Sequence, residues 1–163
     1  MKTLYLVRHA HAVSQQPGLT DFERPLSPQG VAEAHDMAAM LHTMGVCPEV
    51  MIASPATRTM MTAHIFCEQF GMTPQQIIER KDLYEGGTGR VSAILWQEAV
   101  HAASIMIFGH NPTMTAYSAF LVGEVGHAME PCGVMRIDLP IPDWWHVDTL
   151  PGELRWYRQP GDV

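Results

Sequence analysis

A short apolar segment near the N-terminus, TLYLV at residues 3–7, leads directly into Arg8-His9-Ala10. The apolar run has the composition of a buried β-strand, and two reactive side chains follow it. In an open α/β sheet, ligands bind in the crevice outside the carboxyl ends of the strands. The segment therefore predicts a sheet that presents Arg8 and His9 at its ligand-binding edge.

Two further segments repeat this arrangement. Residues 50–53 (VMIA) run into SPATR, which ends at Arg58, and residues 105–108 (IMIF) run into Gly109-His110-Asn111-Pro112. Guanidinium groups match the geometry of phosphate, and a helix that begins near Asn111-Pro112 adds a partial positive charge. We therefore predict an anion site at the ends of these three strands, with phosphate as the best-suited anion.

Each of these residues taken singly has a more ordinary explanation. Arg8 suits an ion pair in the core, and His110 suits a buried imidazole with satisfied hydrogen bonds. The chain also contains nine histidines, most of which are expected to be structural or at the surface. The recurrence of one kind of group at three strand ends, in an acidic chain, favours the anion site.

The rest of the chain alternates between strand and helix patterns. Ser27 is a predicted N-cap with Pro28 at the first helical position, and Gly45 ends that helix. The pattern predicts strands at residues 3–7, 49–53, 77–78, 104–108, 133–139 and 153–158, helices at 28–45, 55–71, 90–100 and 112–123, and loops at 11–24 and 81–89. This alternation indicates an α/β fold with a mostly parallel central sheet and an antiparallel last strand.

Composition limits the class of protein. With 163 residues, 47% hydrophobic and 17% charged, the chain is expected to form one domain over residues 1–163. A net charge of −7 without a basic stripe argues against nucleic acid and membrane surfaces as partners. Cys47, Cys67 and Cys132 lack metal-ligand spacing and suit a reducing compartment. Since the sequence shows no signal peptide or transmembrane run, we expect a soluble cytoplasmic protein.

His9 is the candidate nucleophile. A neutral imidazole attacks phosphorus and carries the phosphoryl group as phosphohistidine, which divides one difficult transfer into two easier steps. Arg8 and Arg58 would hold the non-bridging oxygens, and His110 would add a donor when protonated. The sequence shows no metal-binding cluster or glycine-rich phosphate loop, so we predict a site without metal or cofactor.

Four motifs in order carry a family resemblance. They are RHA at residues 8–10, RPLSPQG at 24–30, SP at 54–55 with Arg58 and TA at 62–63, and GHNP at 109–112. Together they resemble the histidine phosphatase superfamily, and within it the short phosphohistidine phosphatases of the SixA type, which lack large cap insertions. The resemblance covers about three quarters of the chain, from residue 3 to about residue 123.

The resemblance implies a three-layer α/β/α sandwich and a reaction without metal. It implies that His9 accepts the phosphoryl group, that Arg8, Arg58 and His110 form the phosphate pocket, and that Arg24 helps to hold the substrate. Larger relatives use an acidic proton donor for an alkoxide leaving group, and the nearest candidate here is Glu85. A solvated loop carboxylate is an equally good explanation of Glu85.

The leading function is therefore a metal-independent phosphatase that removes phosphate from phosphohistidine on a protein, such as a phosphorelay protein. A phosphoramidate needs less help from an acid than an ester, because its departing nitrogen can already be protonated. The alternatives are a small-molecule phosphomonoesterase, acting on a sugar phosphate or a nucleotide-pathway intermediate, and a non-catalytic phosphoprotein-binding module.

Two further features have open roles. His11 is either at the mouth of the pocket or an ordinary histidine at the start of a loop. Trp144-Trp145-His146 is either a partner surface or, more commonly for such a cluster, a stabilising edge of the fold.

Overall fold

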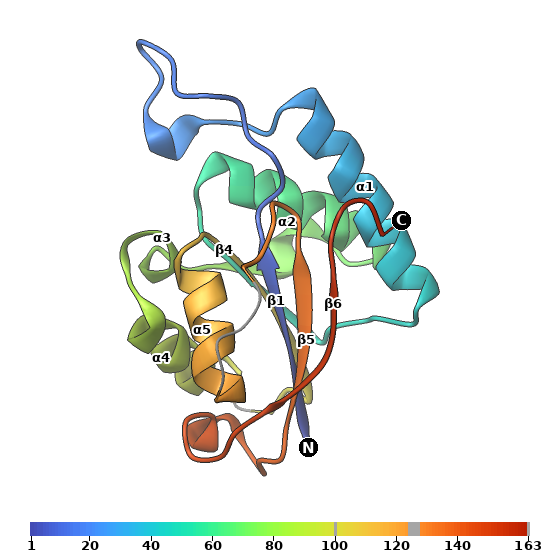
Figure 1. Ribbon diagram of the computed structural model, residues 1–163, viewed down its shortest axis with the longest axis vertical. Coiled ribbons are helices and arrows are strands. Elements are labelled where there is room, and N and C mark those ends of the chain that lie inside the picture. The colour runs from blue at the N-terminus through green and yellow to red at the C-terminus, as the bar shows by residue number, and fades with distance from the viewer. Residues whose placement is uncertain (100, 124–127, 163) are drawn as a thin grey trace.

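A six-stranded sheet with the order β3-β2-β4-β1-β5-β6 lies at the centre of the protein (Figure 1). The computed structural model describes residues 1–99, 101–123 and 128–162. The strands are β1 (Lys2–Arg8), β2 (Val50–Ala53), β3 (Ile77–Glu79), β4 (Ser104–Gly109), β5 (Val134–Leu139) and β6 (Glu153–Arg158). The predicted strands are thus all present.

The first four strands run parallel to one another, which confirms the mostly parallel sheet. Arg8 of β1 is in register with Gly109 of β4, and Ala53 of β2 is in register with Phe108 of β4. The carboxyl ends of these three strands therefore meet at one edge of the sheet. Parallel strands place their ligand-binding groups at this edge.

The two C-terminal strands complete the sheet in an order that the sequence pattern does not reveal. β5 runs antiparallel to β1, and β6 runs antiparallel to β5. The chain enters β5 at the carboxyl edge of β1, where the Cys132 N–H donates to the carbonyl oxygens of Arg8 and His9 at 3.1 and 3.0 Å. Starting at that edge, β5 can only run opposite to β1.

Helices cover both faces of the sheet, as the three-layer α/β/α arrangement requires (Figure 1). On one face, α1 (Pro28–Thr43) and α2 (Thr57–Gln69) pack in the same cluster as Tyr5 and Val7 of β1. On the other face, α3 (Asp82–Glu85), α4 (Thr88–Glu98) and α5 (Thr113–Val122) pack with Leu4 and Leu6. The alternation of side chains along β1 thus supplies both hydrophobic cores.

The helix starts differ in how well the sequence predicts them. The Ser27 hydroxyl accepts from the Gly30 N–H at 3.0 Å, and Pro28 is the first residue of α1. Both observations confirm the predicted N-cap of α1. The predicted loop at residues 81–89 is wrong in part, because α3 forms there and α4 already begins at Thr88. Leu83 explains the difference, since its side chain is buried in the core. The expected helical residue Val100 lies outside the described residues.

The connection between β1 and α1 extends beyond the carboxyl edge of the sheet (Figure 1). It contains one 3₁₀ turn, η1 (Asp21–Glu23), which a capping box between Thr20 and Glu23 stabilises. A bridge between Ala12 and Leu26 joins the two ends of the connection. This geometry brings η1 back over the sheet edge that carries His9.

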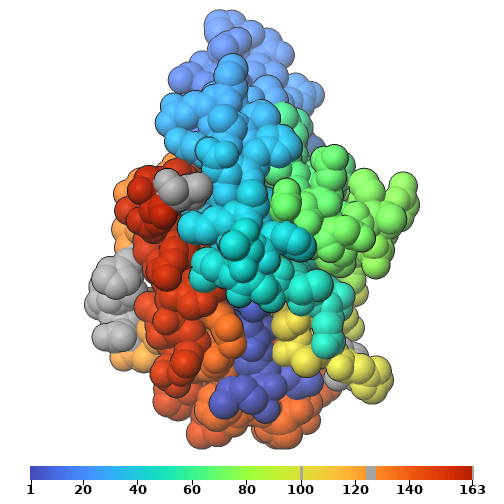
Figure 2. All heavy atoms as spheres, turned by 90° about the vertical axis from the view of Figure 1, so that its right-hand side faces the viewer, coloured from blue at the N-terminus to red at the C-terminus, as the bar shows by residue number. Residues whose placement is uncertain are grey.

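The C-terminal segment lies beside α1 (Figure 2).

Two further 3₁₀ turns, η2 (Pro74–Gln76) and η3 (Trp144–His146), connect the remaining elements. Among the helices of the described residues, none has the length and apolar character that a bilayer span requires.

Candidate active site

One pocket at the carboxyl edge of the sheet gathers the candidate residues. Its volume is about 470 Å³. Five of its side chains are sequence candidates, and the full lining comprises Arg8, His9, His11, Ala12, Asp21, Arg24, Arg58, His110, Asn111 and Pro131. The parallel register of β1, β2 and β4 brings these residues together from distant parts of the chain.

His9 is held by backbone contacts on both sides of its strand end. Its N–H donates to the Gly109 carbonyl oxygen at 3.1 Å, and its own carbonyl accepts from Cys132. The next residue, Ala10, is fully buried, and its N–H donates to the Thr62 hydroxyl at 3.1 Å. The backbone at the candidate nucleophile is therefore anchored to β4, α2 and the entry to β5.

The hydrogen bonds of His9 define its tautomer. Nδ1 lies 2.8 Å from the Ala10 carbonyl oxygen, which can only accept, so Nδ1 carries the proton. Nε2 accepts from Arg58 Nε at 3.3 Å. Burial, together with the positive charges of Arg58 and Arg8, lowers the pKa of His9 to about 4, although the bond to Ala10 opposes this shift. His9 is thus neutral near pH 7, with the Nε2 lone pair in the pocket.

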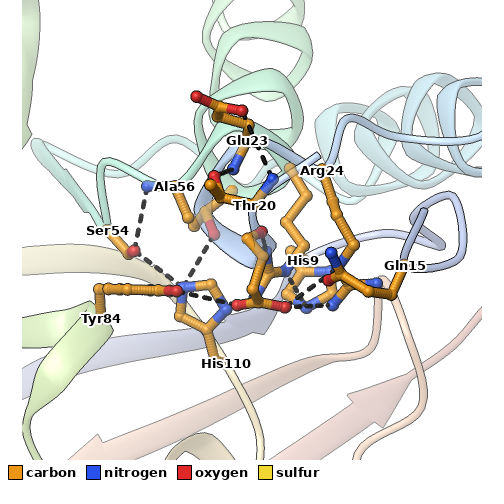
Figure 3. A network of polar contacts seen from close by, with 12 residues as sticks. His9, Gln15, Thr20, Glu23, Arg24, Ser54, Ala56, Tyr84 and His110 are labelled. Atoms are coloured by element: carbon orange, nitrogen blue, oxygen red, sulfur yellow. Dashed lines mark hydrogen bonds and ion pairs between the residues drawn. The ribbon is translucent and has the colours of Figure 1, made fainter. Parts of the chain in front are cut away.

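His110 is neutral as well. Its Nε2 lies 2.8 Å from the Ser54 hydroxyl, and this hydroxyl accepts from the Ala56 N–H at 3.3 Å (Figure 3). The Thr59 hydroxyl also lies 3.2 Å from Nε2. When either hydroxyl donates to Nε2, the imidazole proton is on Nδ1. Burial and the neighbouring His9 and Arg58 lower the pKa of His110 to about 3. In that tautomer the neutral ring donates from Nδ1, so donation by His110 does not need the protonation that the sequence suggested.

Two buried donors in the pocket have no partner within the described residues. They are Nδ1 of His110 and Nε of Arg8. Arg8 uses its Nη1 to donate to the Met129 carbonyl oxygen at 2.8 Å, which fixes the guanidinium. Buried polar groups are normally hydrogen-bonded, so both nitrogens have unused hydrogen-bonding capacity on residues that line the pocket.

Asp21 is a pocket residue that sequence reasoning missed. Its Oδ1 accepts from Arg24 Nε and Nη2 at 3.0 and 2.8 Å. Its Oδ2 accepts from Arg58 Nη2 at 3.1 Å and from the Tyr84 hydroxyl at 2.9 Å. The ion pair of Arg58 is therefore with a half-exposed carboxylate at the pocket and not with one in the core. The sequence holds only a weak signal for Asp21, because Arg24 is the one partner of its carboxylate that lies close to it in the chain, whereas Arg58 and Tyr84 are distant.

The hydrogen bonds keep Asp21 ionised. Burial raises the pKa of this carboxyl, but the bonds from Tyr84, Arg24 and Arg58 outweigh burial and bring the pKa to about 2. Tyr84 also lies edge-on to the His110 ring, with 5.5 Å between the ring centroids. A fixed negative charge therefore lies among the positive groups of the pocket.

Glu85 is not among the residues that line the pocket. Its side chain is 61% exposed and lies 3.7 Å from Lys81 Nζ. The solvated-loop explanation fits this position better than the proton-donor hypothesis, which stays a prediction for experiment.

The fold places the two features with open roles, His11 and the segment 144–146, at opposite ends of the strands. His11 lines the pocket and bonds to the Ser27 hydroxyl through Nδ1 at 2.7 Å. In η3, Trp144 is buried and donates to the Ala102 carbonyl oxygen, while Trp145 is exposed and stacks on Trp96. η3 follows β5 and lies at the opposite edge of the sheet from the pocket (Figure 1).

Within the described residues, no group of three or more His, Cys, Asp or Glu is arranged to hold a metal ion.

The model of the histidine phosphatase superfamily (branch 1) matches residues 4–130. The chain belongs to this superfamily. The match includes every pocket residue except Pro131. Membership of the superfamily, together with the likeness to solved phosphatases, identifies the chain as a phosphatase.

Curated relatives and a solved structure agree with this membership. An uncharacterized protein of Mycobacterium tuberculosis is 30% identical over 71% of this chain and 71% of its own length. An uncharacterized chloroplastic protein of Arabidopsis thaliana is 41% identical over 37% of this chain, and that match spans only 28% of the relative. A crystal structure from Agrobacterium tumefaciens, named as a candidate phosphohistidine phosphatase SixA, superposes with a TM-score of 0.84 at 25% identity, covering 98% of this chain and 99% of that one.

Proposed function

We propose that the protein hydrolyses a phosphoryl substrate through a covalent phospho-His9 intermediate, without a metal ion, and that phosphohistidine on a protein is its substrate. One observation carries the proposal. The unprotonated Nε2 of His9 shares a pocket with Arg8 and His110, whose Nε and Nδ1 atoms have no hydrogen-bond partner within the described residues. This combination provides a nucleophile next to binding groups for an oxyanion.

The reaction proceeds in two steps. His9 Nε2 attacks phosphorus while the bond to the leaving group breaks and its electron pair departs with that group. A water molecule then attacks the phosphoryl group and passes one proton to a phosphate oxygen or to solvent, the P–Nε2 bond breaks, and its electron pair returns to Nε2. Arg8, Arg58 and His110 hold the non-bridging oxygens in both steps, and this positioning and electrostatic stabilisation supply most of the catalysis.

The setting of the pocket supports a phosphate borne on a protein. The helices of the described residues pack on the two faces of the sheet and leave its carboxyl edge, where the pocket lies beside the connection with η1, without a helical layer (Figure 1). A small metabolite is usually recognised by burial of most of its surface, whereas a phosphohistidine side chain needs an accessible edge. A phosphorelay protein is the partner class that we propose. The three free cysteines of this chain support the cytoplasm as the location of the protein itself.

Steady-state hydrolysis of an aryl phosphate, with chelator present, tests the mechanism. We expect His9→Ala to abolish turnover and Arg58→Ala to lower kcat by about 10²–10³-fold, as the loss of one preorganised oxyanion donor does. His35→Ala, an exposed residue of α1, is the matched control and should keep full activity. Rapid-quench mass spectrometry should detect an acid-labile phosphoryl adduct on His9. An adduct on another residue, or activity lost with the chelator, would contradict the mechanism.

A substrate panel tests the substrate class. The panel compares a phosphohistidine-bearing protein with sugar phosphates and nucleotide-pathway phosphates by kcat/KM. Preference for the phosphohistidine protein supports the proposal. A wide preference for a small phosphomonoester would favour the small-molecule phosphatase, and phosphoprotein binding without turnover would favour a binding module.

A further inference from the structure

The carboxylate of Asp21 lies one guanidinium group away from the nucleophile. Arg58 donates from Nε to His9 Nε2 at 3.3 Å and from Nη2 to Asp21 Oδ2 at 3.1 Å. Arg58 Nη1 also donates to the Asp21 carbonyl oxygen at 2.6 Å, so the same arginine fixes the backbone of η1. Both Asp21 and His9 line the pocket, so a substrate that Nε2 attacks lies in the same pocket as this carboxylate.

We propose that Asp21 determines specificity for the leaving group, and that it selects phosphoramidates whose departing nitrogen is protonated, as in phosphohistidine, over alkyl phosphates. This inference rests on the proposed function, because it assigns the substrate class of the same site. The juxtaposition of a fixed carboxylate with the nucleophile is the observation that carries it.

The chemistry of the two leaving groups makes the difference. When the P–N bond of a phosphoimidazole protonated on its second nitrogen breaks, the electron pair goes to the ring, and the ring leaves as neutral imidazole with its N–H intact. An alkyl phosphate leaves as an alkoxide unless an acid supplies a proton. Asp21 is held ionised by Arg24, Arg58 and Tyr84, so it accepts hydrogen bonds and supplies no proton near neutral pH.

The charge of a carboxylate therefore favours cleavage of one substrate and disfavours cleavage of the other. It attracts the positive charge of the protonated ring, and it repels the negative charge that develops on an alkoxide oxygen. In the free pocket four donor nitrogens and oxygens already share the two carboxylate oxygens. When phosphoryl oxygens engage Arg58 Nη2, Oδ2 regains acceptor capacity for the ring N–H.

The variant Asp21→Asn distinguishes this role from two others that the same contacts allow. Asp21 could instead only position Arg24 and Arg58, or it could compete with phosphate for those arginines. Asparagine keeps the shape of the side chain and removes its charge. We expect kcat/KM for phosphohistidine to fall by about tenfold or more, the scale of a hydrogen bond to a charged group. We expect kcat/KM for glycerol 3-phosphate to stay unchanged or to rise. The preference between the two substrates would then shift by at least about tenfold.

Glu23→Gln is the matched control. It removes the same charge from the same 3₁₀ turn, where Glu23 is exposed and forms the capping box with Thr20, and glutamine is also suited to that box. We expect it to keep the wild-type preference. Thermal unfolding of both variants checks that they are folded.

The alternative outcomes are distinct. An equal fall on both substrates would overturn the inference, because Asp21 would then only position Arg24 and Arg58. An equal rise on both would also overturn it, since Asp21 would then merely compete with phosphate for those arginines. Failure of the proposed function looks different, because the wild-type protein itself would then form no phospho-His9 from phosphohistidine.

Discussion

At the scale of single residues, the pocket works by keeping the imidazoles of His9 and His110 neutral and the carboxylate of Asp21 charged. The pKa of His9 is lowered to about 4 and that of His110 to about 3, mainly by burial, while hydrogen bonds hold the pKa of Asp21 at about 2. Near pH 7 the nucleophile is thus ready to attack, and the arginines supply the positive charge. This distribution of charge has consequences for stability as well as for catalysis.

The two half-buried imidazoles predict that acid destabilises the fold. In the unfolded chain a histidine takes up a proton near pH 6.5, whereas folded His9 and His110 stay neutral down to about 4 and 3. Below about pH 6.5 the unfolded state therefore binds more protons, and the free energy of unfolding falls as the pH is lowered toward 4. Urea unfolding at about pH 7.5 and about pH 5.5 measures this fall.

His9→Ala removes one of the two groups and should make the pH dependence shallower. His35→Ala, at an exposed site, should leave it unchanged. A wild-type protein that became more stable between about pH 6.5 and about pH 5.5 would contradict the predicted sign.

Glu85→Gln tests the proton donor predicted from the sequence. A general acid accounts for about 10²–10⁴-fold of the rate on an alkyl phosphate. Because the side chain is 61% exposed and lies outside the pocket lining, we expect a change of at most about twofold on glycerol 3-phosphate, as for other surface substitutions. A loss of about 10²–10⁴-fold that spares phosphohistidine would instead establish Glu85 as the acid.

At the scale of elements, the close approach of α1 to the segment after His9 shapes the mouth of the pocket. A Cβ at Gly30 would lie 2.0 Å from the His11 carbonyl oxygen, so only glycine allows this contact. The Ser27 N–H donates to the same carbonyl at 2.9 Å. The glycine of the RPLSPQG motif thus lets the first turn of α1 hold the backbone that lines the pocket.

Gly30→Ala is expected to destabilise the protein, although alanine is the better helix former. The overpacked contact should cost about 1–3 kcal/mol of unfolding free energy, and displacement of His11 should lower kcat/KM. Gly89→Ala in α4, where nothing lies within 4 Å of the added Cβ, is the control and should stabilise by about 0.4–1 kcal/mol. Chemical denaturation and aryl phosphate hydrolysis measure both effects. Equal stabilisation by the two substitutions would show that α1 can move away from His11.

At the scale of the whole molecule, the pocket joins residues from four segments of the chain. The segment after β1 contributes His9, η1 contributes Asp21, α2 contributes Arg58, and the segment after β4 contributes His110. An anion that binds these groups together binds the folded state and not the unfolded chain. Ligand binding should therefore stabilise the entire fold.

Inorganic phosphate and orthovanadate are expected to raise Tm. At a ligand concentration of about 100 times Kd, the stabilisation should be about 2.7 kcal/mol. Arg58→Ala should remove most of the shift, and sodium chloride at equal ionic strength controls for general salt effects. A shift that persists in Arg58→Ala would place the bound anion elsewhere.

The sequence by itself determined the parallel part of the sheet and the candidates Arg8, His9, Arg58 and His110. The physical reason is local, because apolar runs identify buried strands, and the carboxyl ends of parallel strands necessarily share an edge. Ser27 and Pro28 likewise mark the start of α1 through capping that depends on neighbouring residues only.

Only the tertiary structure decided the direction of β5, the helical turn at residues 82–85 and the place of Asp21. Each depends on contacts between residues far apart in the chain. Cys132 bonds to the backbone of Arg8 and His9, Leu83 is buried in the core, and Asp21 meets Arg58 and Tyr84 across the pocket. No local pattern encodes such distances, so the carboxylate beside the nucleophile could be found only once the chain was folded.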